Sequence, residues 1–276
     1  MAETWLTRLQ ALEVEILKDV DAFCRKEGIR YCIIAGTLLG AVRHGGFIPW
    51  DDDTDIVMPR EDFERFKKLA PGNMGEKYFI STQDNEQGNP KDMIKVRRQG
   101  TVYETRWSMR FPKPCTGIWL DIFPLDEVRR ETGRVQRAVG NFVQGPMQRL
   151  LNSYSQPIEK GSKKALARRL IRLLPFSFYR GIRDGLMQCG NGKGYAYYVN
   201  YFSQYGHRKQ TMPKDWYFPA HDIVFDGVTV LAPHETEKIL TRIYGANYMQ
   251  IPPEEKRVVR KPVRISFNVE GPDEVL

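Results

Sequence analysis

The sequence contains few cysteines and no long apolar run. Its four cysteines are scattered, and no two of them have the C-x-x-C spacing of common zinc and redox motifs. No stretch of about 18 or more apolar residues occurs, and residues 1–27 alternate charged with apolar side chains instead of forming the apolar centre of a signal peptide. These absences predict reduced thiols and a location in the cytoplasm or on the inner face of the cell membrane.

The composition is that of a globular, basic chain. It has 276 residues, 41% of them hydrophobic, which is enough for one substantial core and a smaller second one. The 42 Lys and Arg residues outnumber the 34 Asp and Glu residues and give a formal net charge of +8. This charge favours polyanionic partners, whether phosphates, nucleic acid or an anionic membrane, and does not choose among them.

Short apolar runs alternate with helical patterns along the first half of the chain. The expected elements are helices at 5–26, 38–43 and 61–69 and strands at 31–35, 56–58, 78–81, 93–97 and 118–123. This alternation predicts an α/β (α+β) fold with a mixed β-sheet. We divide the chain into a catalytic core at 1–130, a mainly helical basic region at 131–192, and a C-terminal segment at 193–276 that packs back on the core.

An acidic cluster precedes the second expected strand. Asp53 and Asp55 are two residues apart, so in an extended chain they project from one face, about 6.5 to 7 Å apart. Two such carboxylates suit a hard divalent cation, Mg²⁺ or alternatively Mn²⁺, with substrate phosphates completing its coordination. A solvated turn is the alternative. Four carboxylates within five residues repel one another unless a cation neutralises them, which favours the metal site.

Backbone and cationic groups near this cluster are candidates for binding phosphate. Gly36 and Thr37 are expected to form a turn into a helix whose first N–H groups are free to bind phosphate. Lys95 and Arg97 alternate with apolar residues, so both face one side of a strand and can clamp donor phosphates or remain solvated. Arg43 either contacts phosphate or balances the acidic cluster.

The run AGTLLGAVRHGGFIPWDDDTDI at 35–56 resembles the signature of the LicD family. Later segments also resemble that family: IKVR at 94–97, WLDIFPLD at 119–126, and several positions between 225 and 253. The family includes bacterial phosphocholine transferases and is similar to the fukutin-related sugar phosphotransferases. The resemblance implies a nucleotidyltransferase-like fold in which Gly36 and Thr37 form the phosphate turn while Asp53 and Asp55 bind the metal.

Within this frame, Asp121 is the candidate for a third acidic residue. It would complete the metal site or accept the proton of the attacking hydroxyl, and its alternative is a capping aspartate. Asp51 is expected as an auxiliary ligand because it shares the parity of Asp53 and Asp55. Asp126 is expected to be structural.

Two further patterns leave alternatives open. Aromatic residues are dense at 195–205, where they suit either a cage for a quaternary ammonium group or ordinary core packing. The basic helical stretch at 163–183 suits either an anionic bilayer or a subdomain whose charges lie in water.

The function we predict is Mg²⁺-dependent transfer of a phospho-alcohol group, phosphocholine or similar, from a CDP-activated donor to a hydroxyl. The resemblance implies an acceptor in a cell-surface glycan or glycolipid, such as a polysaccharide, teichoic acid or lipopolysaccharide. If that acceptor is linked to a lipid, the basic stretch at 163–183 suits peripheral membrane association, and we expect no nucleic-acid partner. One alternative is a nucleotidyltransferase that uses a nucleoside triphosphate on a small molecule or nucleic acid. Another is a non-catalytic protein that binds membrane surfaces.

Overall fold

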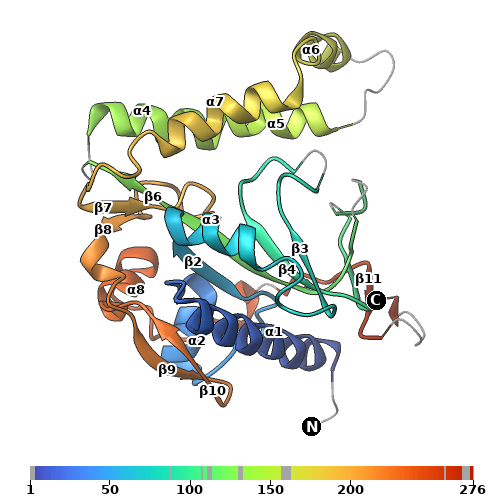
Figure 1. Ribbon diagram of the computed structural model, residues 1–276. Coiled ribbons are helices and arrows are strands. Elements are labelled where there is room, and N and C mark those ends of the chain that lie inside the picture. The colour runs from blue at the N-terminus through green and yellow to red at the C-terminus, as the bar shows by residue number, and fades with distance from the viewer. Residues whose placement is uncertain are drawn as a thin grey trace.

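A mixed β-sheet lies at the centre of the molecule, with a layer of helices from the middle of the chain above it (Figure 1). The computed structural model describes residues 4–86, 89–106, 108–110, 114–129, 133–156, 163–257, 259–268 and 274–275. Its sheet combines parallel and antiparallel pairs, so the predicted α+β class with a mixed sheet is confirmed.

The long first helix, α1 (Trp5–Glu27), has strong local signals at both ends. The Thr4 and Thr7 side chains each accept a hydrogen bond from the other residue's backbone N–H, and Gly28 ends the helix with a φ of 62°. Its apolar stripe is buried. The expected helix is therefore confirmed, because caps and hydrophobic periodicity specify the same segment.

The central sheet has the strand order β1-β2-β6-β4-β3, and β7 and β8 extend it beside the second half of β6. Its strands are β1 (Cys32–Ile33), β2 (Asp55–Pro59), β3 (Tyr78–Ser81), β4 (Ile94–Arg98), β6 (Trp119–Val128), β7 (Tyr197–Val199) and β8 (Thr211–Pro213). The strand expected at 118–123 is longer in the structure because β2 and β7 give its second half new partners. The β2–β6 pair is parallel and the other pairs are antiparallel.

Helices α2 (Ala35–His44) and α3 (Arg60–Leu69) follow β1 and β2. The sequence predicted a turn at Gly36 and Thr37 before this helix. That prediction is wrong, because α2 already begins at Ala35. Ile34 is extended and Ala35 has a φ of 52°, so the chain reverses direction at these two residues. Gly36 and Thr37 consequently occupy the first turn of α2.

The C-terminal part of the chain packs around α1 and the sheet. The hairpin of β9 (His221–Phe225) and β10 (Val228–Ala232) turns at 226–227 and contacts α1, and α8 (Thr236–Tyr244) contacts α2. A small sheet joins β5 (Val102–Glu104), β11 (Arg264–Ser266) and β12 (Glu274–Val275). The strand β11 is thereby paired with β5 from the first half of the chain.

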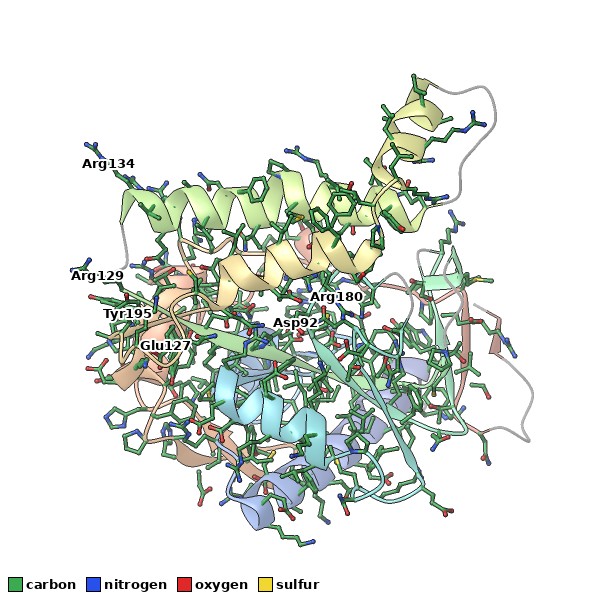
Figure 2. The ribbon with its side chains drawn as sticks, turned by 45° about the horizontal axis from the view of Figure 1, so that its top comes forward. Asp92, Glu127, Arg129, Arg134, Arg180 and Tyr195 are labelled. Atoms are coloured by element: carbon green, nitrogen blue, oxygen red, sulfur yellow. The ribbon has the colours of Figure 1, made fainter. Side chains whose placement is uncertain are left out.

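The helical layer consists of α4 (Arg134–Phe142), α5 (Gln148–Ser155), α6 (Lys163–Ile171) and α7 (Phe176–Gln188). A π-helical turn, Val143–Met147, joins α4 to α5 and contains Pro146, which cannot donate a helical hydrogen bond. In Figures 1 and 2, α6 stands clear of the other helices at the edge of this layer. Residues 130–132 and 157–162 lie outside the described chain, and the three-part division stays a prediction.

Candidate functional site

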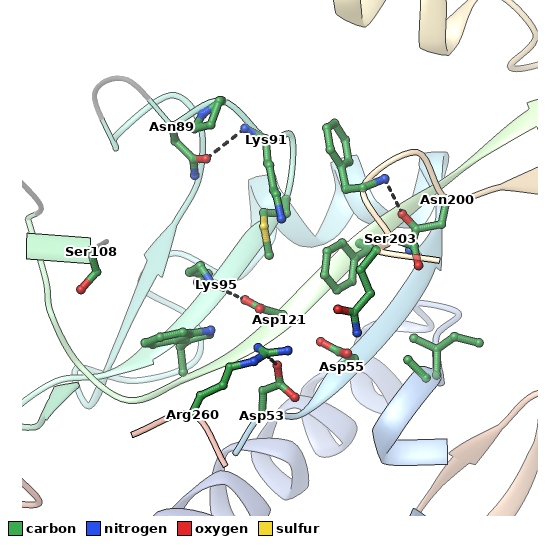
Figure 3. Close-up of a pocket in the computed structure, with 18 of the residues that line it drawn as sticks. Asp53, Asp55, Asn89, Lys91, Lys95, Ser108, Asp121, Asn200, Ser203 and Arg260 are labelled. Atoms are coloured by element: carbon green, nitrogen blue, oxygen red, sulfur yellow. Dashed lines mark hydrogen bonds and ion pairs between the residues drawn. The ribbon is translucent and has the colours of Figure 1, made fainter. Parts of the chain in front are cut away.

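Strand pairing brings the separated acidic residues together. In the parallel β2–β6 pair, Asp55 lies directly opposite Asp121, and in the antiparallel β4–β6 pair Lys95 is the opposite neighbour of Asp121. The Lys95 Nζ donates to Asp121 Oδ1 at 2.5 Å (Figure 3). Asp55 and Lys95, which are 66 and 26 positions from Asp121 in the sequence, thus lie beside Asp121 on the sheet. This place is where β2 begins.

These side chains line a cavity of about 610 Å³. Its wall includes Asp52, Asp53, Asp55, Lys91, Lys95, Tyr103, Trp119, Asp121, Phe123, Gln148, Asn152, Asn200, Phe202, Tyr205, Gln210 and Arg260. Figure 3 shows acidic groups on the floor, Lys91 and Lys95 on one side, and Asn200 and Ser203 on the other. A cavity of this size with a few charged groups and an apolar remainder is typical of a small-ligand site.

Asp52, Asp53, Asp55 and Asp121 line this cavity, and Asp51 lies beside them without being part of the lining. Oxygen atoms of Asp51, Asp52 and Asp53 lie within 4.8 Å of one another. Burial and repulsion from neighbouring aspartates raise the pKa of Asp51 to about 7 and that of Asp53 to about 6. Burial also raises the pKa of Asp55, with added repulsion from Asp53 and Asp121. The negative charge gathered here exceeds what the neighbouring cations neutralise.

The structure adds two carboxylates to the predicted site: Asp52, which the sequence reasoning counted in the acidic run without giving it a role, and Glu13, which it missed. Asp52 is buried and accepts a hydrogen bond from the Tyr103 hydroxyl at 2.8 Å. Glu13 lies on the buried stripe of α1, and burial together with the charges of Asp53 and Asp52 raises its pKa. The sequence did contain a signal for Glu13, because a lone carboxylate at helical spacing between Leu9 and the following apolar positions is out of place on a core-facing stripe.

Arg260 is a further residue that the sequence reasoning missed. It comes from the Pro-rich and charged tail, and its Nη1 lies 3.2 Å from Asp53 Oδ2. Nothing in the local sequence marks this arginine among the many others in the chain. Its position depends on β11 pairing with β5, which holds the tail beside the cavity.

The first turn of α2 carries one carboxylate close to its backbone. A Cβ added to Gly36 would lie 2.4 Å from Asp51 Oδ2, so only glycine leaves room for this carboxylate. The Thr37 hydroxyl is buried and accepts the backbone N–H of Asp55 at 2.8 Å. The structure therefore gives Gly36 and Thr37 a positioning role for the acidic residues, and their contact with phosphate stays a prediction.

The three basic residues predicted to contact phosphate occupy different environments. Lys95 faces the cavity and pairs with Asp121. Arg97 also lines the cavity, but it is buried and binds Glu86 at 2.8 Å. Arg43 is not part of the lining and donates to the backbone carbonyls of Tyr248 and Gln250. Of the three, Lys95 has the placement that a phosphate contact requires.

Aromatic residues form much of the remaining wall. Phe202 and Tyr205 from the dense aromatic stretch line the cavity, whereas Tyr198 and Tyr201 are buried in the core. Core packing therefore describes Tyr198 and Tyr201, and the cage for a quaternary ammonium group stays a prediction. The indole N–H of Trp119, also on the cavity wall, is buried and has no hydrogen-bond partner among the described residues.

The oxygen-only donor set fits a hard divalent cation. The carboxylates around Asp53 provide oxygen ligands of the kind that Mg²⁺ and Mn²⁺ prefer, and no thiol or imidazole lies among the lining residues. The positive charges of Lys95 and Arg260 are fewer than the negative charges of the carboxylates around them, so the two cations do not neutralise the cluster. These residues are therefore suited to hold a metal ion.

Comparison with known proteins agrees with this geometry. The sequence of residues 28–137 matches the LicD/FKTN/FKRP nucleotidyltransferase domain. We call residues 28–137 the LicD-family domain after this match. The resemblance predicted from the signature is thus confirmed. The LicD-family domain contains the aspartates at 51–55, Lys95 and Asp121, whereas Glu13, Arg260 and the aromatic pair Phe202 and Tyr205 lie outside it.

Relatives of the LicD-family domain include named phosphotransferases. The lipopolysaccharide cholinephosphotransferase LicD of Haemophilus influenzae is 28% identical in an alignment 267 residues long that covers 92% of this chain and 95% of that protein. The mouse and human ribitol 5-phosphate transferase FKRP are each 44% identical over 67 residues, which are 24% of this chain and 13% of those proteins. The first similarity spans the helical region and the C-terminal segment as well as the LicD-family domain.

Proposed function

We propose that this chain transfers a phospho-alcohol group, phosphocholine or a similar group, from a CDP-activated donor to a hydroxyl of a cell-surface glycan or glycolipid. The broader class, a transferase of phosphorus-containing groups, is the one to which its named relatives belong. The observation that carries the finer proposal is the register of β2 and β6. It places Asp55 opposite Asp121 on the floor of a ligand-sized cavity.

In the proposed reaction, the acceptor hydroxyl oxygen attacks the phosphorus atom that bears the alcohol. A new P–O bond forms as the P–O bond to the second phosphate of the diphosphate breaks, so that CMP leaves and a phosphodiester remains. The acceptor proton passes to a carboxylate, for which Asp121 is the candidate. Lys95 holds Asp121 through its 2.5 Å hydrogen bond and adds positive charge near the donor phosphates.

Asp53 and Asp55, with Asp51 as an auxiliary ligand, are the residues we propose to hold Mg²⁺. The Asp121 carboxylate either joins them as a ligand or serves as the base. When bound, the ion would supply positive charge that offsets the charge of the donor's diphosphate oxygens. The chain contributes the preorganised part: Thr37 fixes the backbone of Asp55, and Tyr103 fixes the carboxylate of Asp52.

The aromatic wall of the cavity suits the alcohol part of the donor. Phe123, Phe202 and Tyr205 line the cavity together with Trp119. Trp119 already has the Lys95 Nζ 4.2 Å from its ring centroid. A quaternary ammonium group held over such rings gains about 0.5–2 kcal/mol for each contact. The H. influenzae relative is named for a choline phosphate and the FKRP relatives for a ribitol phosphate, and this wall supports the first of these groups.

Calorimetric titration tests the proposal. CDP-choline, CDP-ethanolamine, CDP-ribitol and CTP are titrated into the protein with and without Mg²⁺, and the series is repeated on Asp53→Asn. Asp215→Asn is the matched control, because Asp215 is an exposed aspartate outside the cavity lining.

We expect one CDP-alcohol to bind only with Mg²⁺, with binding lost in Asp53→Asn and kept in Asp215→Asn. Binding of CTP without any CDP-alcohol would replace the proposal with nucleotidyl transfer. The absence of metal-dependent binding to all four compounds would refute the metal site.

A further inference from the structure

The edge of the helical layer exposes a group of large apolar side chains. These side chains, which we call the apolar ridge, lie on α6, on the turn that follows it and on α7, and each is 40–77% exposed: Leu166, Leu170, Leu173, Leu174, Phe178 and Ile182. Soluble proteins rarely leave such a contiguous group in water, and an exposed apolar surface of this kind marks an interaction site.

Three leucines of the apolar ridge lie in line along α6 and the turn that follows it. Leu166, Leu170 and Leu173 are four and three residues apart, so they form a single stripe along α6 and into the turn after it. The Arg172 guanidinium donates to the backbone carbonyls of Tyr154 and Gln156, which fixes this turn to the end of α5. The turn that carries part of the ridge is therefore fixed to the helical layer, at whose edge α6 lies (Figures 1 and 2).

The segment that carries the apolar ridge is basic, although two of its arginines are paired: Arg180 contacts Asp84 at 3.0 Å, and Arg183 is buried beside Asp184. Residues 163–183 contain no Asp or Glu, and their Lys and Arg residues are Lys163, Lys164, Arg168, Arg169, Arg172, Arg180 and Arg183. Exposed leucines beside arginines match the two layers of a bilayer surface, with apolar side chains among the acyl chains and cations at the headgroups. A second copy of this chain would bring an equally basic face and be repelled.

Hydrogen bonds connect α7, which carries part of the apolar ridge, to a loop in the wall of the cavity. On α7, Arg180 donates to the Gln83 carbonyl at 3.0 Å and Arg183 to the Pro90 carbonyl at 2.7 Å. These bonds hold the loop that contributes Asn89, Pro90 and Lys91 to the cavity wall. Figure 2 shows Arg180 on the side of α7 that faces this loop. A surface that docks through the ridge therefore lies at a fixed distance from the cavity.

We propose that the apolar ridge docks this protein on an anionic lipid bilayer, with its leucines in the interfacial layer and its arginines at the headgroups. Among the described residues, no helix is long and apolar enough to span a bilayer, so the proposed attachment is peripheral. Docking needs neither donor nor metal and therefore stands independently of the proposed transfer reaction. It would hold the cavity beside the membrane surface, where an acceptor carried on a lipid is presented.

Vesicle co-flotation of the full chain tests this proposal. The probes are vesicles of phosphatidylcholine alone and vesicles with 30% phosphatidylglycerol, at low and high salt. The disruptive variant is the double mutant Leu170→Glu/Leu173→Glu, which changes exposed side chains and so spares the core. Val224→Glu is the matched control, because Val224 is 57% exposed on the β9–β10 hairpin, away from the ridge.

We expect the wild type and Val224→Glu to float with the anionic vesicles, and the binding of both to weaken in high salt. The double mutant should bind at least about tenfold more weakly, since two leucines lose their burial in the bilayer. Its circular dichroism spectrum and its calorimetric binding of the CDP-alcohol should be unchanged, which separates docking from the transfer reaction.

Three results would overturn the proposal. The wild type could fail to float, or the double mutant could float as well as the wild type. The third is a dimer of the wild type, measured by light scattering, that the double mutant abolishes without any vesicle binding. That third result would assign the ridge to contact between copies of the chain.

Discussion

The Arg260 guanidinium meets the Asp53 carboxylate at 3.2 Å, although the two residues are 207 positions apart in the sequence. Arg260 lowers the pKa of Asp53 against the larger effect of burial. Arg260 thus lies on the side of the acidic cluster that faces the C-terminal tail. Its positive charge repels a cation and attracts an anion that binds there.

Replacement of Arg260 is predicted to change metal and donor binding in opposite directions. Without its positive charge, Arg260→Gln should bind Mg²⁺ several-fold more tightly and the anionic donor several-fold more weakly. Calorimetry with each ligand measures both constants. Arg257→Gln is the control, because Arg257 lies over Trp50 and not against Asp53. A change of both affinities in the same direction would contradict the assignment.

Substitutions of two aspartates on β6 are predicted to affect different properties: one lowers turnover and the other lowers the free energy of unfolding. Asp121 lines the cavity, whereas Asp126 is fully buried and receives two hydrogen bonds from Arg60, at 2.8 and 2.9 Å. Asp126→Ala should lower the free energy of unfolding by about 3–5 kcal/mol, since it leaves the buried Arg60 with fewer partners. Asp121→Asn should lower turnover by about 100-fold or more with a much smaller effect on unfolding.

Denaturant titration and initial rates distinguish these two variants. The comparison is informative because both residues lie on one strand, five positions apart. If Asp121→Asn unfolded as readily as Asp126→Ala while its folded fraction kept full turnover, Asp121 would be structural.

Gly36→Ala is predicted to disturb the acidic cluster through Asp51. Its new Cβ would meet Asp51 Oδ2 at 2.4 Å, and alanine is otherwise favourable in a helix. The carboxylate must therefore move, and Mg²⁺ affinity should fall at least about threefold, with about 1–3 kcal/mol of destabilisation from overpacking.

Gly181→Ala provides the helical glycine control for that measurement. An added Cβ at Gly181 meets no atom within 4 Å, so this variant should keep its metal affinity and gain slightly in stability. Equal metal affinities for the Gly36 variant, the Gly181 variant and the wild type would show that Asp51 does not serve as a ligand.

The stability of the folded chain is predicted to fall in mild acid because of His207. Burial, with the charge of Arg208, lowers its pKa below the usual value. Its backbone N–H donates to Gln144 Oε1, and its Nε2 is buried without a partner among the described residues. The stabilising contribution is complete above pH about 6.5 and declines as the pH falls from there through the folded pKa, because only the unfolded chain readily takes up the proton.

Urea unfolding at pH 7.5, 6.5 and 5.5 measures this decline. His207→Gln should have a shallower pH dependence than the wild type, by up to about 1.4 kcal/mol for each pH unit within that window. His221→Gln, at an exposed histidine, should follow the wild type. Parallel curves for the wild type and His207→Gln would exclude the assignment.

The secondary structure near the N-terminus followed from local signals. α1 and β3 match their expected ranges because caps, glycine and apolar spacing act within a few residues. The length of β6 could not be obtained in this way, because its last residues are extended only through pairing with β7, about 70 positions later.

For the acidic residues as well, local sequence determined some features and contacts between distant parts of the chain determined others. The sequence alone determined the LicD-family signature, the paired Asp53 and Asp55 and the candidacy of Asp121, since residue type and spacing express the need for oxygen ligands. Only the tertiary structure decided that Asp121 lies opposite Asp55, that Asp52 lines the cavity, that Glu13 joins the cluster, and that Arg260 contacts Asp53. Those contacts arise from strand register and chain packing, which bring together residues that no local pattern connects.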